Sequence, residues 1–118
     1  MYITLQMTAD TPKHTAVKHV SANQWGPAND TTSLIGVTLE DAYQDPDTGL
    51  WWAPVVISGQ DIFLTADAAI PDEGGFLHIR NGGRAYVDNS STGCGTVAPR
   101  NIGEPERVAG SLIFVHMR

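Results

Sequence analysis

The sequence predicts a mainly β protein, a small single-domain β-sandwich or barrel with at most one short helical turn. Apolar and polar residues alternate over short runs, which is the period of a strand with one buried face. Gly, Pro, Asn and Asp separate these runs, and the 3.6-residue period of an amphipathic helix is almost missing. A chain of 118 residues can bury one core without disulfides or metal ions.

The N-terminal region has two alternating runs of different character. Residues 2–7 place apolar side chains on one face and polar ones on the other, as in a half-buried strand. Residues 15–20 also alternate, but Lys13 and Lys18 lie in or beside this run, which favours an edge or partner-facing strand. We therefore expect residues 1–20 to form an N-terminal arm of edge strands and residues 21–118 to form the compact β domain.

Turn-forming residues mark the middle of the chain. Residues 21–32 are rich in Asn, Asp, Gly and Pro and predict a loop with Trp25 as its large anchor. The segment 45–49, Asp-Pro-Asp-Thr-Gly, predicts a hairpin turn, and Asn-Gly-Gly at 81–83 predicts a tight hairpin. Residues 66–69 allow at most one helical turn before Pro71.

The C-terminal run, residues 111–117, is apolar on both faces. Such a strand should lie in the centre of a sheet or under another chain. The expected strands are residues 2–7, 15–20, 33–39, 51–57, 61–65, 76–80, 84–88, 95–98 and 111–117.

Charge and hydropathy disfavour two classes of partner. The chain has 13 acidic and 7 basic residues, a net charge of −6, whereas nucleic-acid and anionic-lipid binding need clustered Lys and Arg. It has no apolar run long enough for a membrane helix, and its first residues lack the features of a signal peptide. We expect neither a nucleic-acid nor a membrane partner.

Histidine and cysteine residues are present, but their positions in the sequence do not fit a catalytic or metal site. His14 and His19 are five apart and would lie on opposite faces of a strand, and His78 with His116 supplies only two metal ligands. Cys94 is the single cysteine and has no basic neighbour in sequence to stabilise a thiolate. Glycine-rich phosphate loops and serine-nucleophile motifs are missing too. We therefore predict no catalytic residues, no metal and no cofactor.

Aromatic residues suggest contact surfaces instead. Trp51 and Trp52 are adjacent, so their side chains must point to opposite faces of a strand, and one of them should face outward. Trp is favoured at protein contacts, although a loop of the same domain could also cover it. The candidate residues for capsid binding or self-association are Tyr2, Ile3, Leu5, Met7, Lys13, Lys18, Trp25, Trp51 and Trp52.

Several short motifs resemble those of the bacteriophage capsid decoration, or cement, proteins. They are IGVTLEDA at 35–42, GRAYVD at 83–88, TGCGTV at 92–97, Ile-Gly at 102–103 and the terminal strand. Residues 45–52 and 99–107 depart from the family pattern. The resemblance implies a non-enzymatic protein on the exterior of a virion, commonly a homotrimer, that clamps neighbouring major capsid proteins. It carries over no active-site residue.

For a capsid-binding protein, the alternating N-terminal run, residues 2–7 together with residues 15–20, could add to an open sheet edge of a capsid neighbour. Alternatives from other classes remain. A small β recognition module would bind carbohydrate or protein through Trp51, Trp52 and Tyr86. A small β-barrel enzyme would need His78, His116 and an acid to converge. Another virion structural component, such as a head-completion protein, is a further possibility.

Overall fold

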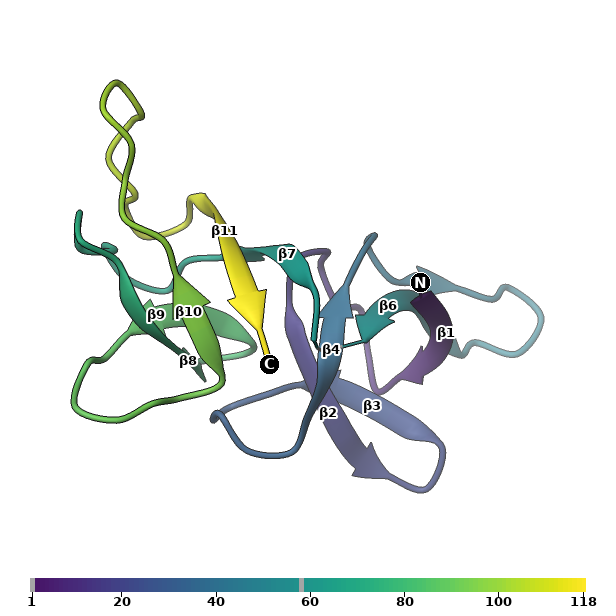
Figure 1. Cartoon of the computed structure of the whole chain (residues 1–118). Coiled ribbons are helices and arrows are strands. Elements are labelled where there is room, and N and C mark those ends of the chain that lie inside the picture. The colour runs from purple at the N-terminus through teal and green to yellow at the C-terminus, as the bar shows by residue number, and fades with distance from the viewer. Residues whose placement is uncertain (1, 58) are drawn as a thin grey trace.

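The computed structural model describes residues 2–57 and 59–118 and shows an all-β protein built from two sheets (Figure 1). The molecule is elongated, with extents of 49 × 27 × 25 Å. Within the described ranges there is no helix, and so none that could cross a membrane. The first-sheet strands are β1 (Tyr2–Met7), β2 (Ala16–Ser21), β3 (Gln24–Pro27), β4 (Leu34–Thr38), β5 (Tyr43–Gln44) and β6 (Trp51–Ile57). The second-sheet strands are β7 (Asp61–Thr65), β8 (Gly75–Arg80), β9 (Arg84–Val87), β10 (Gly95–Val97) and β11 (Leu112–Met117).

The first sheet closes into a five-stranded barrel in the order β1-β3-β2-β4-β6, with β5 added beside β6. β1 closes it, because it runs antiparallel to β6 from Tyr2 opposite Val56 to Met7 opposite Trp51, and also pairs with β3. Its core is small and apolar, formed by Leu5, Met7, Val17, Ala42, Ala53 and Val55. The mainly β fold predicted from sequence is confirmed.

Residues 21–32 correct one expectation, because this segment is not wholly a loop. Residues 24–27 form β3, which pairs with β2 and places Trp25 opposite His19. Gly26 lies opposite Lys18 and is buried, and a Cβ there would crowd Thr8 and Val20. The strand is hidden in the sequence because its four residues include both Gly and Pro, which are depleted in strands.

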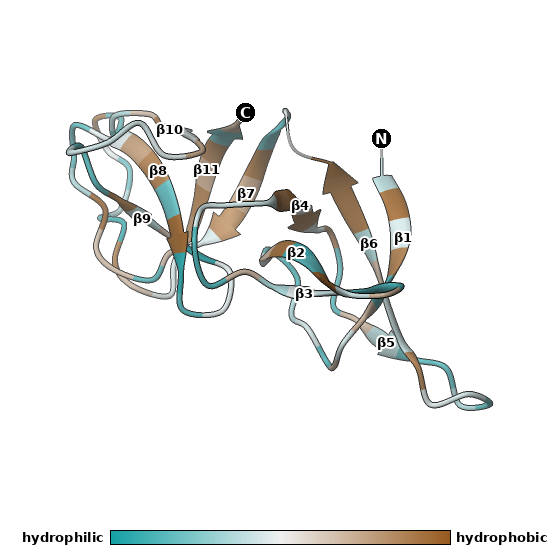
Figure 2. Ribbon diagram, turned by 90° about the horizontal axis from the view of Figure 1, so that it is seen from below, coloured by the Kyte–Doolittle hydropathy of each residue, from teal (hydrophilic) through white to brown (hydrophobic). Residues whose placement is uncertain are grey.

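The second sheet has the order β7-β11-β10-β8-β9, so the terminal strand β11 lies inside the sheet, between β7 and β10, and not at an edge. The two edges of this sheet approach each other, because Ala66, which follows β7, forms a parallel bridge with Ala85 on β9. Residues 66–69 therefore do not form the helical turn that the sequence allowed. The predicted hairpin at 81–83 joins β8 to β9, with Asn81, Gly82 and Gly83 all at positive φ. Figure 2 shows the strongest hydrophobic colour on the strands and paler or hydrophilic colour on most loops.

The two sheets share one core. Ala16, Ala28 and Val37 from the barrel side pack in the same cluster as Leu64 and Leu77 of the second sheet. Backbone hydrogen bonds also join them, from Ala16 to Gly83 (2.9 Å) and from Thr65 to His14 (3.1 Å). Of the expected N-terminal arm, residues 1–20, the structure places residues 2–7 in the barrel as β1, and residues 16–21 form β2 beside it.

Candidate docking surface

Three apolar side chains stand on the outer face of the second sheet, and we call them the apolar ridge: Phe63, Leu112 and Phe114. Phe63 on β7 lies directly opposite Phe114 on β11, and their rings meet edge to face with centroids 5.1 Å apart. Their exposed fractions are 44% and 53%, and that of Leu112 is 48%. Leu112 and Phe114 are exposed because side chains alternate along β11: Ile113, Val115 and Met117 point into the core, so their neighbours point outward.

Hollows flank the ridge on both sides. A groove of about 480 Å³ lies between the ridge and residues 98–107, where Pro105 and Glu106 form part of its wall. A second hollow of about 290 Å³ lies toward the barrel, lined by His14 and Leu39 as well as by Phe63 and Phe114. Grouped exposed apolar side chains with polar residues around them are typical of protein-contact surfaces.

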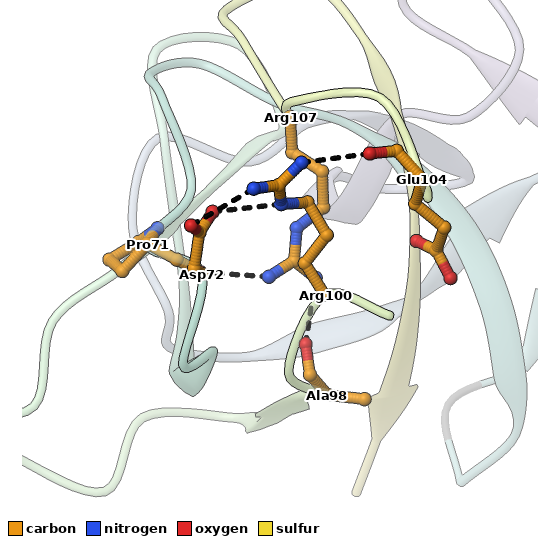
Figure 3. Close-up of polar contacts among 6 residues, drawn as sticks. All are labelled: Pro71, Asp72, Ala98, Arg100, Glu104 and Arg107. Carbon is orange, nitrogen blue, oxygen red and sulfur yellow. Dashed lines mark hydrogen bonds and ion pairs between the residues drawn. The ribbon is translucent and has the colours of Figure 1, made fainter. Parts of the chain in front are cut away.

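Residues 98–107, here called the projecting loop, extend away from the second sheet (Figure 1). Two arginines hold its base (Figure 3). Arg100 donates from Nε and Nη2 to the two carboxylate oxygens of Asp72, at 2.9 and 3.0 Å, and from Nη1 to the Glu104 carbonyl at 2.8 Å. Arg107 donates to the carbonyls of Ala98 (2.7 Å) and Pro71 (2.8 Å). The loop is thus braced without helix or strand structure.

Charge around the groove is mixed, because the projecting loop carries two arginines, Arg100 and Arg107, and two glutamates. The hydrogen bonds from Arg100 lower the pKa of Asp72 below its ordinary value, and Asp72 in turn raises the pKa of Arg100. Glu104 and Glu106 lie on the same loop. At the other end of the ridge, His116 Nδ1 lies 2.7 Å from an Asp61 carboxylate oxygen.

The predicted contact residues do not gather at one place. Leu5 and Met7 are buried in the barrel, whereas Tyr2, Ile3 and Lys13 are exposed and Lys18 is half-buried. Trp25 and Trp51 are half-buried and pack against the barrel core. Trp52 is also half-buried, and it lies on β6 opposite Gln6 on one side and Tyr43 on the other.

Sequence analysis missed the residues of the apolar ridge as site candidates, although it contained a signal for two of them. The terminal strand is apolar on both faces, and in the sheet only one of these faces packs against the core, which leaves Leu112 and Phe114 exposed. Phe63 had no signal of its own, because its place depends on the pairing of β7 with β11.

The reactive residues lie in separate environments. His78 is buried, and its Nε2 contacts the carbonyls of Asp88 (3.0 Å) and Ser91 (3.3 Å), whereas His116 pairs with Asp61 on the exposed face. Burial raises the pKa of Cys94 to about 11, which keeps this thiol protonated at neutral pH. The convergence of His78 and His116 that an enzyme would need is not formed in the described chain.

A comparison with solved structures shows that the fold occurs elsewhere. The chain is similar to the crystal structure of the head fiber gp8.5 N base in bacteriophage phi29, with a TM-score of 0.71 and 15% sequence identity. The match covers 100% of this chain and 93% of that chain. Neither a protein-family model nor a curated protein sequence matches this chain. At this identity the likeness establishes a shared fold over the full length of the described domain.

Proposed function

We propose that this chain is a structural component of a phage virion that binds the outer surface of the head. The observation that carries the proposal is the fold match to the head fiber N base, because it spans nearly the whole of both chains. The short motifs that resemble capsid decoration proteins point independently to the same class of protein. Its partner would be the major capsid protein, and its work would be to cement neighbouring subunits without making or breaking a covalent bond.

The structure supports docking by a folded surface. The apolar ridge and its two flanking hollows provide exposed hydrophobic area next to polar groups, the composition of many protein interfaces. Strand addition by residues 2–7 would have to use the other edge of β1, because β6 pairs with one edge along its whole length and β3 meets the other at Met7. A homotrimer, as the decoration-protein resemblance implies, would use other surfaces, such as the barrel wall around Trp52 and Tyr43.

Binding to heads tests the proposal. The purified chain would be mixed with empty, expanded heads assembled from the major capsid protein of the same genome and then sedimented. We expect saturable co-sedimentation and a higher temperature of shell disruption in the decorated heads. A chain that stays in the supernatant over the whole titration would contradict the proposal.

A second candidate function is carbohydrate recognition by the barrel wall. Trp52 lies directly opposite Tyr43, and Tyr43 is more than half exposed, so a stacking surface for a sugar ring is available there. Glycan-array binding that is lost in Trp52→Ala and kept in Phe114→Ser would favour this function over head binding.

A further inference from the structure

Strand β7 lies at one edge of the second sheet, and its outer edge has free backbone groups. The Ala66 amide donates to the Ser111 carbonyl beside β11 (2.9 Å), whereas the Thr65 amide donates to the His14 carbonyl (3.1 Å), away from β11. Backbone groups alternate in direction along a strand, so Phe63, two residues before Thr65, also directs its amide and carbonyl away from β11. Within residues 2–57 and 59–118, no hydrogen bond uses either group. The edge can therefore pair with another strand at Phe63.

An apolar hollow lies along this free edge. Its volume is about 290 Å³, and Phe63 and Phe114 line one side while Leu39 and Val56 of the barrel line the other. Both ribbon views place β7 between β11 and the barrel strand β4 (Figures 1 and 2). In a strand added to β7, the residue opposite Phe63 would project on the same face of the sheet as the Phe63 ring. That residue would enter the hollow, and an apolar side chain would fit its lining.

The wall of the hollow is fixed by the fold. His14 has a φ of 62°, an unusual value for a residue other than glycine. Its amide donates to the Thr38 carbonyl (2.8 Å) and its carbonyl accepts from Thr65, so both sheets hold it in this conformation. The imidazole meets the Phe63 ring edge to face, with centroids 6.4 Å apart. A preformed wall loses little conformational entropy when a partner binds.

These features select an extended polypeptide as the occupant. A free amide and a free carbonyl on a strand edge are satisfied by the backbone of an extended segment, whereas a folded apolar surface leaves them without partners. A second copy of this chain fits poorly. Its only strand with a long free edge that we identify, β1, is joined to β6 along the other edge and would bring the barrel with it, against the wall of Leu39 and Val56. Two copies would also each carry a net charge of −6.

We propose that the outer edge of β7 accepts an extended segment of the major capsid protein, which pairs with Phe63 through its backbone and places an apolar side chain in the hollow beside Leu39. The inference rests on the proposed function and specifies which edge of this chain takes part and which chemistry the capsid protein supplies. The apolar ridge borders the same hollow and would be covered by the same contact.

Amide hydrogen exchange tests the backbone pairing directly. In the free chain the Phe63 amide should exchange with solvent much faster than the Leu64 amide, which faces β11. The chain would then be bound to the empty, expanded heads, exchanged, quenched, released and measured by NMR. We expect exchange at Phe63 to slow at least about ten-fold on the heads.

The outcomes of this experiment separate the inference from the proposed function. Binding to heads with unchanged exchange at Phe63 would overturn the inference and leave the proposed function intact, whereas a chain that does not bind heads would remove both. Protection of Phe63 that appears without heads and grows with chain concentration would show that a second copy occupies the edge, which also contradicts the inference.

Two leucines of similar exposure test the hollow. Leu39 lines it and is 38% exposed, whereas Leu50 is 37% exposed and lies beside the turn at 45–49. Leu39→Ser should weaken head binding by about ten-fold, because the apolar contact with the inserted side chain is lost. Leu50→Ser is the control and should leave binding unchanged. Equal binding by the two variants would contradict insertion into the hollow.

A second matched pair tests the amide itself. Phe63→Pro and Phe63→Ala both remove the aromatic ring, but only proline removes the outward-facing amide hydrogen, and neither removes a hydrogen bond to β11. Phe63→Pro should bind heads about five-fold more weakly than Phe63→Ala, the effect of one lost hydrogen bond. Equal binding by the two folded variants would contradict backbone pairing at this position. Circular dichroism verifies folding, and the exchange experiment needs no variant.

Discussion

The barrel and the second sheet differ in how much apolar surface they leave exposed. The barrel joins its first strand to its last, and it turns Leu5, Met7 and Val55 inward. The second sheet also fills its inner face with large aliphatic side chains, but its outer face keeps the exposed apolar ridge beside a groove of about 480 Å³. Alternate residues of β11 therefore differ in role: one set packs in the core, and the other set is exposed and can contact a partner.

The largest expected effect tests whether the barrel depends on its N-terminal strands. Deleting residues 1–20 removes β1 and nearly all of β2, two of the five strands that close the barrel. Because Ala16 and Val37 also belong to the core shared with the second sheet, we expect the whole chain to lose its cooperative thermal transition. Circular dichroism would measure this, and a native-like β spectrum with a cooperative melt would show that residues 1–20 are an arm after all.

Neighbouring residues of β11 separate folding from docking. Ile113 is buried, so Ile113→Ala should lower the free energy of unfolding by about 2–5 kcal/mol. Phe114 is exposed on the other face and loses mainly its edge contact with Phe63, so Phe114→Ser should cost less than about 1.5 kcal/mol. Urea denaturation gives both values. If Phe114→Ser proved as destabilising as Ile113→Ala, the two faces of the strand would not differ in role.

The buried hydroxyl group of Thr38 is expected to contribute to the stability of the barrel. Thr38 Oγ1 accepts from the Thr15 amide (3.0 Å) and donates to the Pro12 carbonyl (2.8 Å), and Thr38 is fully buried. Thr38→Val keeps the shape but leaves that amide and carbonyl without these partners, which should cost about 1–3 kcal/mol. Thr38→Ser is the control that retains the hydroxyl. Equal stability of the Val and Ser variants would indicate that these hydrogen bonds do not contribute.

The smallest expected effect is local and depends on pH. Arg100 lowers the pKa of Asp72 below the ordinary value of 3.8, so the ionised carboxylate stabilises the folded loop at neutral pH. This contribution is present above the unfolded-state pKa and is lost as the pH falls through the folded-state pKa. We expect the NMR signal of the Arg100 Nε proton to move toward its solvent-exposed position below about pH 4, with little change in the barrel.

Asp72→Asn provides the comparison for that titration. The variant removes the titrating carboxylate, so its Arg100 signal should already be near the exposed position at neutral pH. A signal that titrates identically in both proteins would show that Asp72 is not the group that holds Arg100.

Local turn chemistry could be predicted from the sequence, but long-range pairing could not. The turn at 45–49 and the hairpin at 81–83 were predicted correctly because Pro, Asn and Gly restrict or permit particular backbone angles. The closure of the barrel joins β1 to β6 across some forty residues of intervening chain, and alternation in residues 2–7 is equally compatible with a free arm.

The candidate surface was hidden for a similar reason. The two apolar faces of residues 111–117 were visible, yet Phe63 joins Phe114 only through the register of β7 and β11. Site residues brought together by tertiary pairing cannot be recovered from periodicity alone.

Cryo-electron microscopy of heads mixed with the purified chain tests the central claim most directly. The account predicts that the second sheet faces the shell, with the apolar ridge of Phe63, Leu112 and Phe114 covered by the major capsid protein. Density in which the barrel wall around Trp52 meets the shell, while the apolar ridge faces solvent, would contradict it.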